Sequence, residues 1–159
     1  MSLSFTLTET MSGLHHFVDP GRGDANDRRF YFRLDWGARR PAQLNPFGQE
    51  FMIFEATGWI LVDGLTPGEV PCTGTLEIDY FGRHTITYVL DFEVDGESYH
   101  FVGEKVDVNP LRPLMLVKTH TTCYGTLTDA AGAVVSRSVT HFEPSTLVPF
   151  ITSFRLGLG

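Results

Sequence analysis

The chain has 159 residues, of which 42% are hydrophobic and 19% are charged. This size and composition predict one globular domain spanning residues 1–159, and they argue against two domains, a coiled coil or a disordered chain. Twelve basic and nineteen acidic residues give a net charge of -7, which disfavours nucleic acid and anionic membrane surfaces as partners.

The first nine residues show neither a basic segment nor a long apolar stretch, so no signal peptide is expected. No later window approaches the ~18 apolar residues that a membrane span needs. We therefore expect a cytoplasmic protein with no membrane span. The cysteines Cys72 and Cys123 are too few for a secreted disulfide scaffold, which favours reduced buried thiols over the alternative of a disulfide.

Glycine and proline separate runs that are rich in Phe, Tyr, Val, Ile and Thr, a layout that predicts an all-β domain. No segment has the apolar recurrence of a long helix, and residues 39–44 have room for one short helical turn. In chain order, the expected strands are 3–11, 28–36, 51–62, 72–80, 85–94, 98–106, 114–127, 133–142 and 150–156.

Two connections predict hairpins. Asp95-Gly96 supplies the positive φ angles that a two-residue type I′ turn requires, and residues 129–132 join two further long runs. A two-residue turn fixes the register of the first hairpin, which pairs Val94 with Glu97, Phe92 with Tyr99, Leu90 with Phe101, Tyr88 with Gly103 and Ile86 with Lys105. Successive hairpins of this kind make a meander.

Eight or nine antiparallel strands with one aromatic face either close into a barrel or stack as a β-sandwich. The long strands and the meander order favour a closed or nearly closed antiparallel β-barrel of the calycin or lipocalin-like kind, with the sandwich as the alternative. A barrel of this size either holds one small ligand or is filled by its own side chains.

The inner face of the predicted hairpin supplies candidate residues for holding a hydrophobic ligand. Lys105 shares that face and could bind a carboxylate, act as a base or form a Schiff base; the alternative is a strand-end lysine whose ammonium reaches the rim. His120 could line the polar end of a cavity, or be structural or exposed. The apolar candidates are Tyr88, Leu90, Phe92, Tyr99 and Phe101.

The remaining polar residues suggest no further site. Asp91 and His100 are expected as a loose, diagonal pair on the solvated outer face, and strand parity points His120 and Cys123 to opposite faces. The adjacent residues His15 and His16 diverge on a strand, so no metal is expected. Glycine-rich nucleotide or dinucleotide loops and hydrolase elbows are absent from the sequence, so we expect no cofactor.

Four stretches of the chain are similar to a known type of region: FTLTETMSG at 5–13, GTLEIDYFGRHTITYVLDFEVDGESYHFVGEKVDV at 74–108, HTTCYGTL at 120–127 and SRSVTHF at 136–142. Together they resemble a small β-rich accessory region found with bacterial cholesterol-oxidase-like flavoproteins of the glucose-methanol-choline family. The resemblance implies an association with apolar, sterol-like or lipid-like molecules, and it assigns no catalytic residue. The flavin-binding glycine fingerprint of that family is missing here.

Three hypotheses follow for function. The leading one is a barrel that binds a hydrophobic small molecule. The second is a cofactor-independent isomerase or cyclase that moves a proton with Lys105 or His120. The third is an accessory domain that docks on an oxidoreductase through an exposed apolar patch including Trp36 or Trp59, and an apolar rim would also allow a homodimer.

Overall fold

The computed structural model describes residues 3–106, 108, 122–142 and 155–158, and its regular elements are nine strands and one short 3-10 turn. The strands up to the middle of the chain are β1 (Leu3–Phe17), β2 (Arg28–Gly37), β3 (Ile53–Val62), β4 (Val70–Asp79) and β5 (Thr85–Val94). They are followed by β6 (Glu97–Lys105), β7 (Thr122–Asp129), β8 (Val134–Phe142) and β9 (Arg155–Leu158). The 3-10 turn, η1 (Pro41–Leu44), lies between β2 and β3 and confirms the short turn expected there.

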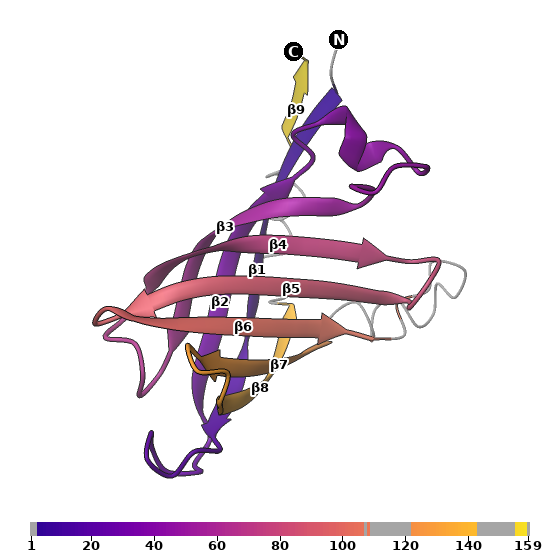
Figure 1. Cartoon of the computed structure of the whole chain (residues 1–159). Helices are drawn as coiled ribbons and strands as arrows, with labels where there is room; N and C mark the ends of the chain where they lie inside the picture. Colours follow the sequence, from indigo (N-terminus) through magenta and orange to yellow (C-terminus); the bar gives the residue numbers. More distant parts are fainter. Residues whose placement is uncertain (1–2, 107, 109–121, 143–154, 159) are drawn as a thin grey trace.

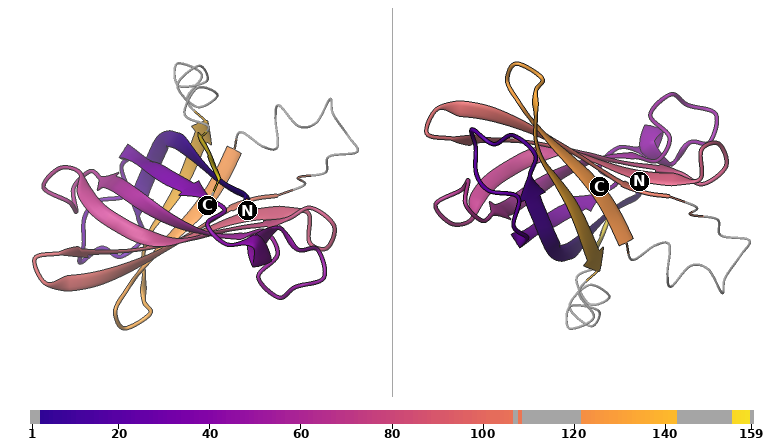
Figure 2. Two further views of the ribbon diagram at one scale, coloured as in Figure 1. Left: turned by 90° about the horizontal axis from the view of Figure 1, so that it is seen from above. Right: turned by 90° about the horizontal axis from the view of Figure 1, so that it is seen from below.

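Strands β1 to β8 form a closed antiparallel barrel (Figure 1). Each strand from β2 to β8 pairs with the next, and β1 pairs with both β8 and β2 to close the cylinder. β9 adds to the first residues of β1, which places the two ends of the chain side by side (Figure 2). The predicted barrel is confirmed, and the sandwich alternative is wrong because continuous pairing around the ring leaves no second sheet.

β1 is six residues longer than the sequence predicted, because the strand continues past Met11 to Phe17. The sequence-based prediction ended this strand at Met11. In the structure a Cβ at Gly13 would lie 2.0 Å from the carbonyl oxygen of Val139 on β8. Because glycine has no Cβ, the backbones of β1 and β8 can approach closely at this position. The strand therefore continues past Gly13, and its pairing with β8 closes the barrel.

The β5–β6 hairpin has the predicted register, from Val94 opposite Glu97 to Ile86 opposite Lys105. Its two-residue turn has φ angles of 52° at Asp95 and 78° at Gly96, as a type I′ turn requires. The β7–β8 hairpin at residues 129–132 is also present. The other strand boundaries agree with the prediction to within two residues, except that 114–121 and 150–154 lie outside the described residues.

Aromatic rings from opposite walls fill the middle of the barrel. Phe30 and Phe32 on β2 lie 5.2 and 5.6 Å from Phe101 on β6, and Phe32 lies 5.3 Å from Tyr88 on β5, measured between ring centroids. The largest fully buried side chains include these four, together with Phe54, Met11, Leu34, Ile60, Leu76, Leu90 and Leu127. The central layer is therefore a packed core.

The meander places alternate connections at opposite ends of the barrel. The β1–β2, β3–β4, β5–β6 and β7–β8 connections lie at one end, which we call the Arg22 end. The η1 connection, the turn between β4 and β5, and strand β9 lie at the other, which we call the Glu9 end. Among the described residues, no helix is long and apolar enough to cross a membrane.

Candidate functional site: a buried ion pair at one end of the barrel

A carboxylate and an ammonium group meet inside the barrel near the Glu9 end. Lys105 is the last residue of β6, and Glu9 lies in the first half of β1. Both residues occupy inward-facing positions in the alternation of their strands, so their side chains point into the barrel. Lys105 Nζ donates to Glu9 Oε1 at 2.8 Å, and the two residues are 3% and 5% exposed. Both charges are therefore withdrawn from water and compensate each other.

Tyr88 and Trp36 complete the shell of donors around Glu9. The Tyr88 hydroxyl donates to Oε1 and Oε2 at 2.9 and 3.1 Å, and Trp36 Nε1 donates to Oε2 at 3.2 Å. Burial, and then the Glu9 carboxylate, raise the pKa of Tyr88 well above its ordinary value, so the phenol keeps its proton. Each Glu9 carboxylate oxygen thus accepts hydrogen bonds from two donors.

Such a buried pair is weak evidence for a purely stabilising role. The desolvation of two charges offsets much of their mutual attraction, and well-packed apolar residues of similar volume are often as stable. The cost of burying Glu9 and Lys105 therefore marks the cluster as a candidate functional site.

Aromatic side chains pack against Trp36, whose indole donates to Glu9. Phe5, Trp36 and Phe54 form a group with ring centroids 5.5 to 6.2 Å apart. Ile78 near the end of β4, and Tyr80 directly after that strand, are partly buried against the core. Aromatic rings therefore border the Trp36 side of the cluster.

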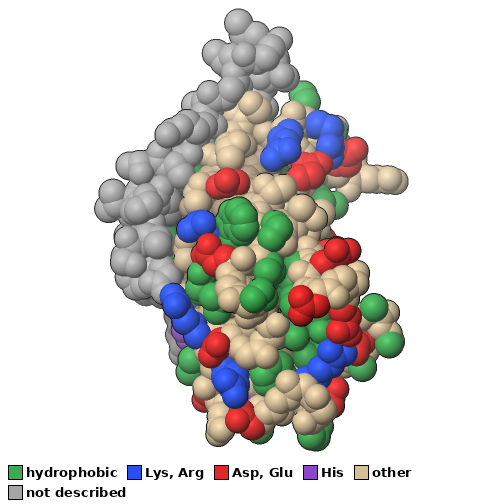
Figure 3. All heavy atoms as spheres, turned by 90° about the vertical axis from the view of Figure 1, so that its left-hand side faces the viewer, with side chains coloured by type: hydrophobic (Ala, Val, Ile, Leu, Met, Phe, Trp, Pro, Cys, Tyr) green, Lys and Arg blue, Asp and Glu red, His purple; other side chains and the backbone are tan. Residues whose placement is uncertain are grey.

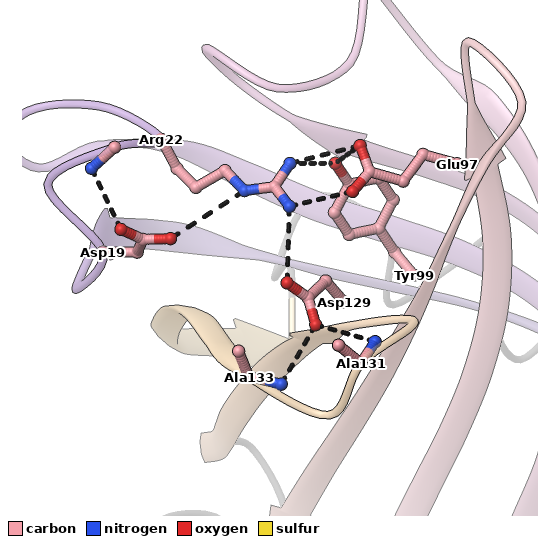
Figure 4. Close-up of polar contacts among 8 residues, drawn as sticks. Asp19, Arg22, Glu97, Tyr99, Asp129, Ala131 and Ala133 are labelled. Atoms are coloured by element: carbon pink, nitrogen blue, oxygen red, sulfur yellow. Dashed lines mark hydrogen bonds and ion pairs between the residues drawn. The ribbon is translucent and has the colours of Figure 1, made fainter.

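Arg22 spans the opposite end of the barrel (Figure 4). From the β1–β2 connection its guanidinium donates to Glu97 at 2.8 and 3.2 Å, to the Tyr99 hydroxyl at 2.8 Å and to Asp129 at 3.3 Å. The Asp129 carboxylate in turn accepts hydrogen bonds from backbone N–H groups of the turn that follows β7. The hydrogen bond from Arg22 is the main cause of the lowered pKa of Glu97. Through these contacts the Arg22 side chain links three connections of the barrel.

His15 is a second buried polar residue near the Arg22 end. Its Nε2–H donates to the Asp63 carbonyl oxygen at 2.8 Å, which leaves Nδ1 to accept the Ser136 hydroxyl at 2.9 Å. This arrangement fits the neutral ring. Burial lowers the pKa of His15 below its ordinary 6.5, which favours the same form. His15 therefore contributes to the packing of β1 against the β3–β4 connection and β8.

The structure places the predicted ligand-binding residues on the inner face, as their register requires. Tyr88 and Lys105 belong to the Glu9 cluster, whereas Leu90 and Phe101 lie in the packed core. Phe92 and Tyr99 stack with centroids 5.6 Å apart near the Arg22 end. The set therefore does not form one site, and His120 lies outside the described residues. The alternative of a Lys105 ammonium at the rim is wrong, because Glu9 holds it in the interior.

The Asp91 and His100 pair differs in detail from the prediction. The two residues are direct cross-strand partners rather than diagonal neighbours, and His100 Nδ1 lies 2.7 Å from Asp91 Oδ1. Both side chains are exposed on the outer face, as expected. An exposed ion pair of this kind contributes little to stability.

Two surface hollows are lined wholly by described residues. One, of about 340 Å³, lies on the outer face of β1 and β8 beside His16, Arg137 and His141. The other, of about 690 Å³, lies where β4 diverges from the β5–β6 hairpin, and Phe92 and Tyr99 form part of its wall. Neither Glu9 nor Lys105 lines these two hollows.

The outer surface carries a mixture of charges around hydrophobic groups, as seen on the face in Figure 3. Across β1, β8 and β7, the partly exposed side chains Leu14, Val139 and Tyr124 are successive cross-strand partners. Trp59 on β3 is 43% exposed, whereas Trp36 is 8% exposed and turned inward. Trp36 therefore cannot belong to an outer docking patch, contrary to the third hypothesis.

The described residues include no group of three His, Cys, Asp or Glu side chains with the geometry of a metal site. Cys72 and Cys123 are both buried free thiols, which excludes a disulfide between them in this structure. Burial raises the pKa of each thiol to about 12. For Cys123 the Lys105 ammonium opposes that effect without overcoming it, so both cysteines are protonated at neutral pH.

Sequence reasoning missed Glu9, which is the centre of the cluster. A signal was present, because Phe5, Leu7, Glu9 and Met11 alternate on one face of the first predicted strand. A charged residue in phase with apolar ones is a candidate for a buried, paired group. Its partner could not be identified in this way, since Glu9 and Lys105 are 96 residues apart.

No protein-family model, no curated protein and no solved structure matches the chain.

Proposed function

We propose that this barrel binds a small, largely apolar molecule whose carbonyl or carboxylate oxygen accepts a hydrogen bond from Lys105. The observation that carries the proposal is the buried Glu9–Lys105 pair within an apolar interior. Binding pockets for small molecules are typically apolar with a few polar groups that fix the orientation of the ligand.

Glu9 has more of its hydrogen-bonding capacity occupied than Lys105 has. Glu9 accepts hydrogen bonds from Lys105, Tyr88 and Trp36, so its carboxylate is well satisfied. Lys105 has three N–H donors, and within the described chain its acceptor is Glu9 Oε1. The Tyr88 ring, 5.3 Å from Nζ, provides only a weaker cation–π contact. Since no second acceptor for Lys105 lies among the described residues, the cluster favours a ligand with an acceptor oxygen.

The surroundings of the pair favour an apolar body for that ligand. The middle of the barrel is filled by Phe30, Phe32 and Phe101, so a ligand that reaches Lys105 has to enter from the Glu9 end. There it would meet the rings of Phe5 and Trp36. Of the predicted ligand-binding residues, this assignment uses Tyr88 and Lys105, whereas Leu90 and Phe101 belong to the packed core and Phe92 and Tyr99 lie near the Arg22 end.

Trp36 provides a direct test, because its indole donates to Glu9 and the only other tryptophan is Trp59 on the outer face. In a Trp59→Phe background, Trp36 fluorescence is titrated with 2-naphthoate, decanoate and 2-decanone, with naphthalene as the ligand that lacks an acceptor. We expect saturable quenching by the acceptor-bearing compounds, at least about tenfold weaker in the Glu9→Gln/Lys105→Met double variant.

Arg137→Met is the matched control, because it removes a cation from the exposed outer face of β8 and should leave binding unchanged. A parallel measurement is mass spectrometry of the organic extract of the purified protein. Equal affinity for naphthalene and 2-naphthoate would contradict the role of Lys105. An empty extract together with no binding by any compound would exclude the proposed function.

A second candidate function is a cofactor-independent isomerase, which the adjacency of a carboxylate, an ammonium and a phenol favours. In that case Glu9 would remove a proton from the carbon beside a carbonyl group while Lys105 and Tyr88 stabilised the oxygen. The test is deuterium incorporation from D₂O into 2-decanone. Exchange that is catalysed by the native chain and lost in Glu9→Gln would support this candidate, and a rate equal to that of buffer would exclude it.

A further inference from the structure

We infer that Lys105 is a nucleophile that binds aldehydes or ketones covalently and reversibly, as an iminium ion held by Glu9. This inference rests on the proposed function, because it concerns the same ligand site. It goes further by naming the chemical class of ligand and the bond that forms.

The choice of lysine at this position supports the inference. Only two of the 12 basic residues of the chain are lysines, Lys105 and Lys118, and the other ten are arginines. A permanent buried ion pair is better served by arginine, whose planar guanidinium stays charged and binds a carboxylate through two hydrogen bonds. Lysine differs in that its nitrogen can release a proton and attack a carbonyl carbon.

The position of Glu9 allows the proton to be moved without another reactant. Lys105 Nζ lies 2.8 Å from Glu9 Oε1, so the ammonium can transfer one proton to the carboxylate and become a neutral amine. The amine nitrogen then attacks the carbonyl carbon, and one of its protons passes to the former carbonyl oxygen to give a carbinolamine. Glu9 returns its proton to the hydroxyl group, which leaves as water while the C=N bond forms. Overall, the Lys105 ammonium and a carbonyl compound give an iminium and water.

The contacts that hold the ammonium would also hold the product. The iminium keeps the positive charge and one N–H, which can donate to the same Glu9 oxygen, and it remains near the Tyr88 ring. Tyr88 and Trp36 continue to donate to Glu9 and fix the orientation of its carboxylate. The pair is thus preorganised for the charge of the product, in surroundings that exclude most water.

The composition of the chain makes the experiment specific. The amines available to an aldehyde are Lys105, Lys118 and the α-amino group of the chain, so the last two serve as internal references. The unmodified protein is incubated with substoichiometric to excess 2-naphthaldehyde and sodium cyanoborohydride, which reduces the iminium to a stable amine. Peptide mapping by mass spectrometry then gives the fraction modified at each amine.

We expect labelling of Lys105 to saturate at one equivalent and to proceed at least tenfold faster than labelling of Lys118. Without the reductant, dialysis should restore the unmodified mass. Glu9→Gln should slow labelling of Lys105 by tenfold or more and leave Lys118 unaffected, and Lys118→Met should retain the rapid labelling. Excess 2-naphthoate should compete with the aldehyde at Lys105 alone.

Labelling of Lys105 no faster than Lys118 would overturn the inference. If 2-naphthoate still binds in a Lys105-dependent manner in that case, the proposed binding function stands and only the covalent step is wrong. If neither compound interacts with Lys105, both proposals fail together. Because the main comparison uses the native chain, it does not depend on whether a substituted protein folds.

Discussion

Phe30 on β2 and Phe101 on β6 face each other across the barrel with ring centroids 5.2 Å apart. Phe101 also lies over Gly103 and Gly125, where a side chain would occupy the space of its ring. The two rings therefore join opposite walls and divide the interior into two ends. The charged groups Glu9 and Lys105 lie toward one end, and Arg22 spans the other.

Separating the buried charges should reveal whether they are needed for stability. Lys105→Met leaves the Glu9 carboxylate buried without its counter-charge and should lower the free energy of unfolding by about 3–5 kcal/mol. In Glu9→Gln/Lys105→Met both charges are absent, and stability should return to within about 1 kcal/mol of the native chain. Urea unfolding followed by circular dichroism measures both. A double variant as unstable as the single one would indicate a structural role for the pair.

The glycine beneath Phe101 should not tolerate a side chain. A Cβ at Gly125 would lie 2.3 Å from Phe101 Cε2 and 2.4 Å from Ser138 Oγ, so the ring has to move. Gly125→Ala should lower the free energy of unfolding by about 1–3 kcal/mol through overpacking. Gly68→Ala is the control, because no atom lies within 4 Å of the added Cβ. Equal unfolding midpoints for the two variants would contradict the packing described here.

Protonation of His15 should destabilise the fold. Because burial lowers its pKa in the folded chain below the ordinary 6.5, the unfolded chain binds more protons near and below that pH. The stability contributed by neutral His15 is therefore present above pH 6.5 and is lost as the pH falls toward and through the folded pKa. Thermal unfolding between pH 7.5 and 5 should show a smaller slope in His15→Gln than in the native chain. Identical slopes would exclude His15 as a contributor.

The Arg22 contacts should hold the connections at their end of the barrel together. Arg22→Gln removes the ion pairs with Glu97 and Asp129, and we expect faster amide hydrogen exchange in residues 18–27 and 130–133. Exchange at the Glu9 end should not change. Arg83→Gln, which breaks an exposed pair with Glu77, is the matched control and should leave both segments at native rates. Unaltered exchange in Arg22→Gln would show that the backbone alone closes this end.

Local patterns in the sequence determined much of the barrel. Alternation of apolar and polar residues specifies which side chains of a strand share a face, and the Asp95-Gly96 turn fixes the register of β5 against β6. The inward positions of Tyr88, Phe101 and Lys105 follow from these two rules. The same reasoning ended β1 too early at Met11, because the effect of Gly13 depends on how closely β8 approaches it.

Only the tertiary structure decided how these faces meet. Closure between β1 and β8 depends on the tilt and stagger of the whole sheet, which the alternation within one strand does not specify. That closure brings Glu9 to Lys105 across 96 residues, and the end connections bring Arg22 to Glu97 across 75. The sequence by itself therefore determined the strands and the face that Lys105 shares with Tyr88 and Phe101, and it favoured a barrel over a sandwich. The partner of that lysine, and hence its chemistry, was decided by contacts between strands that no local turn connects.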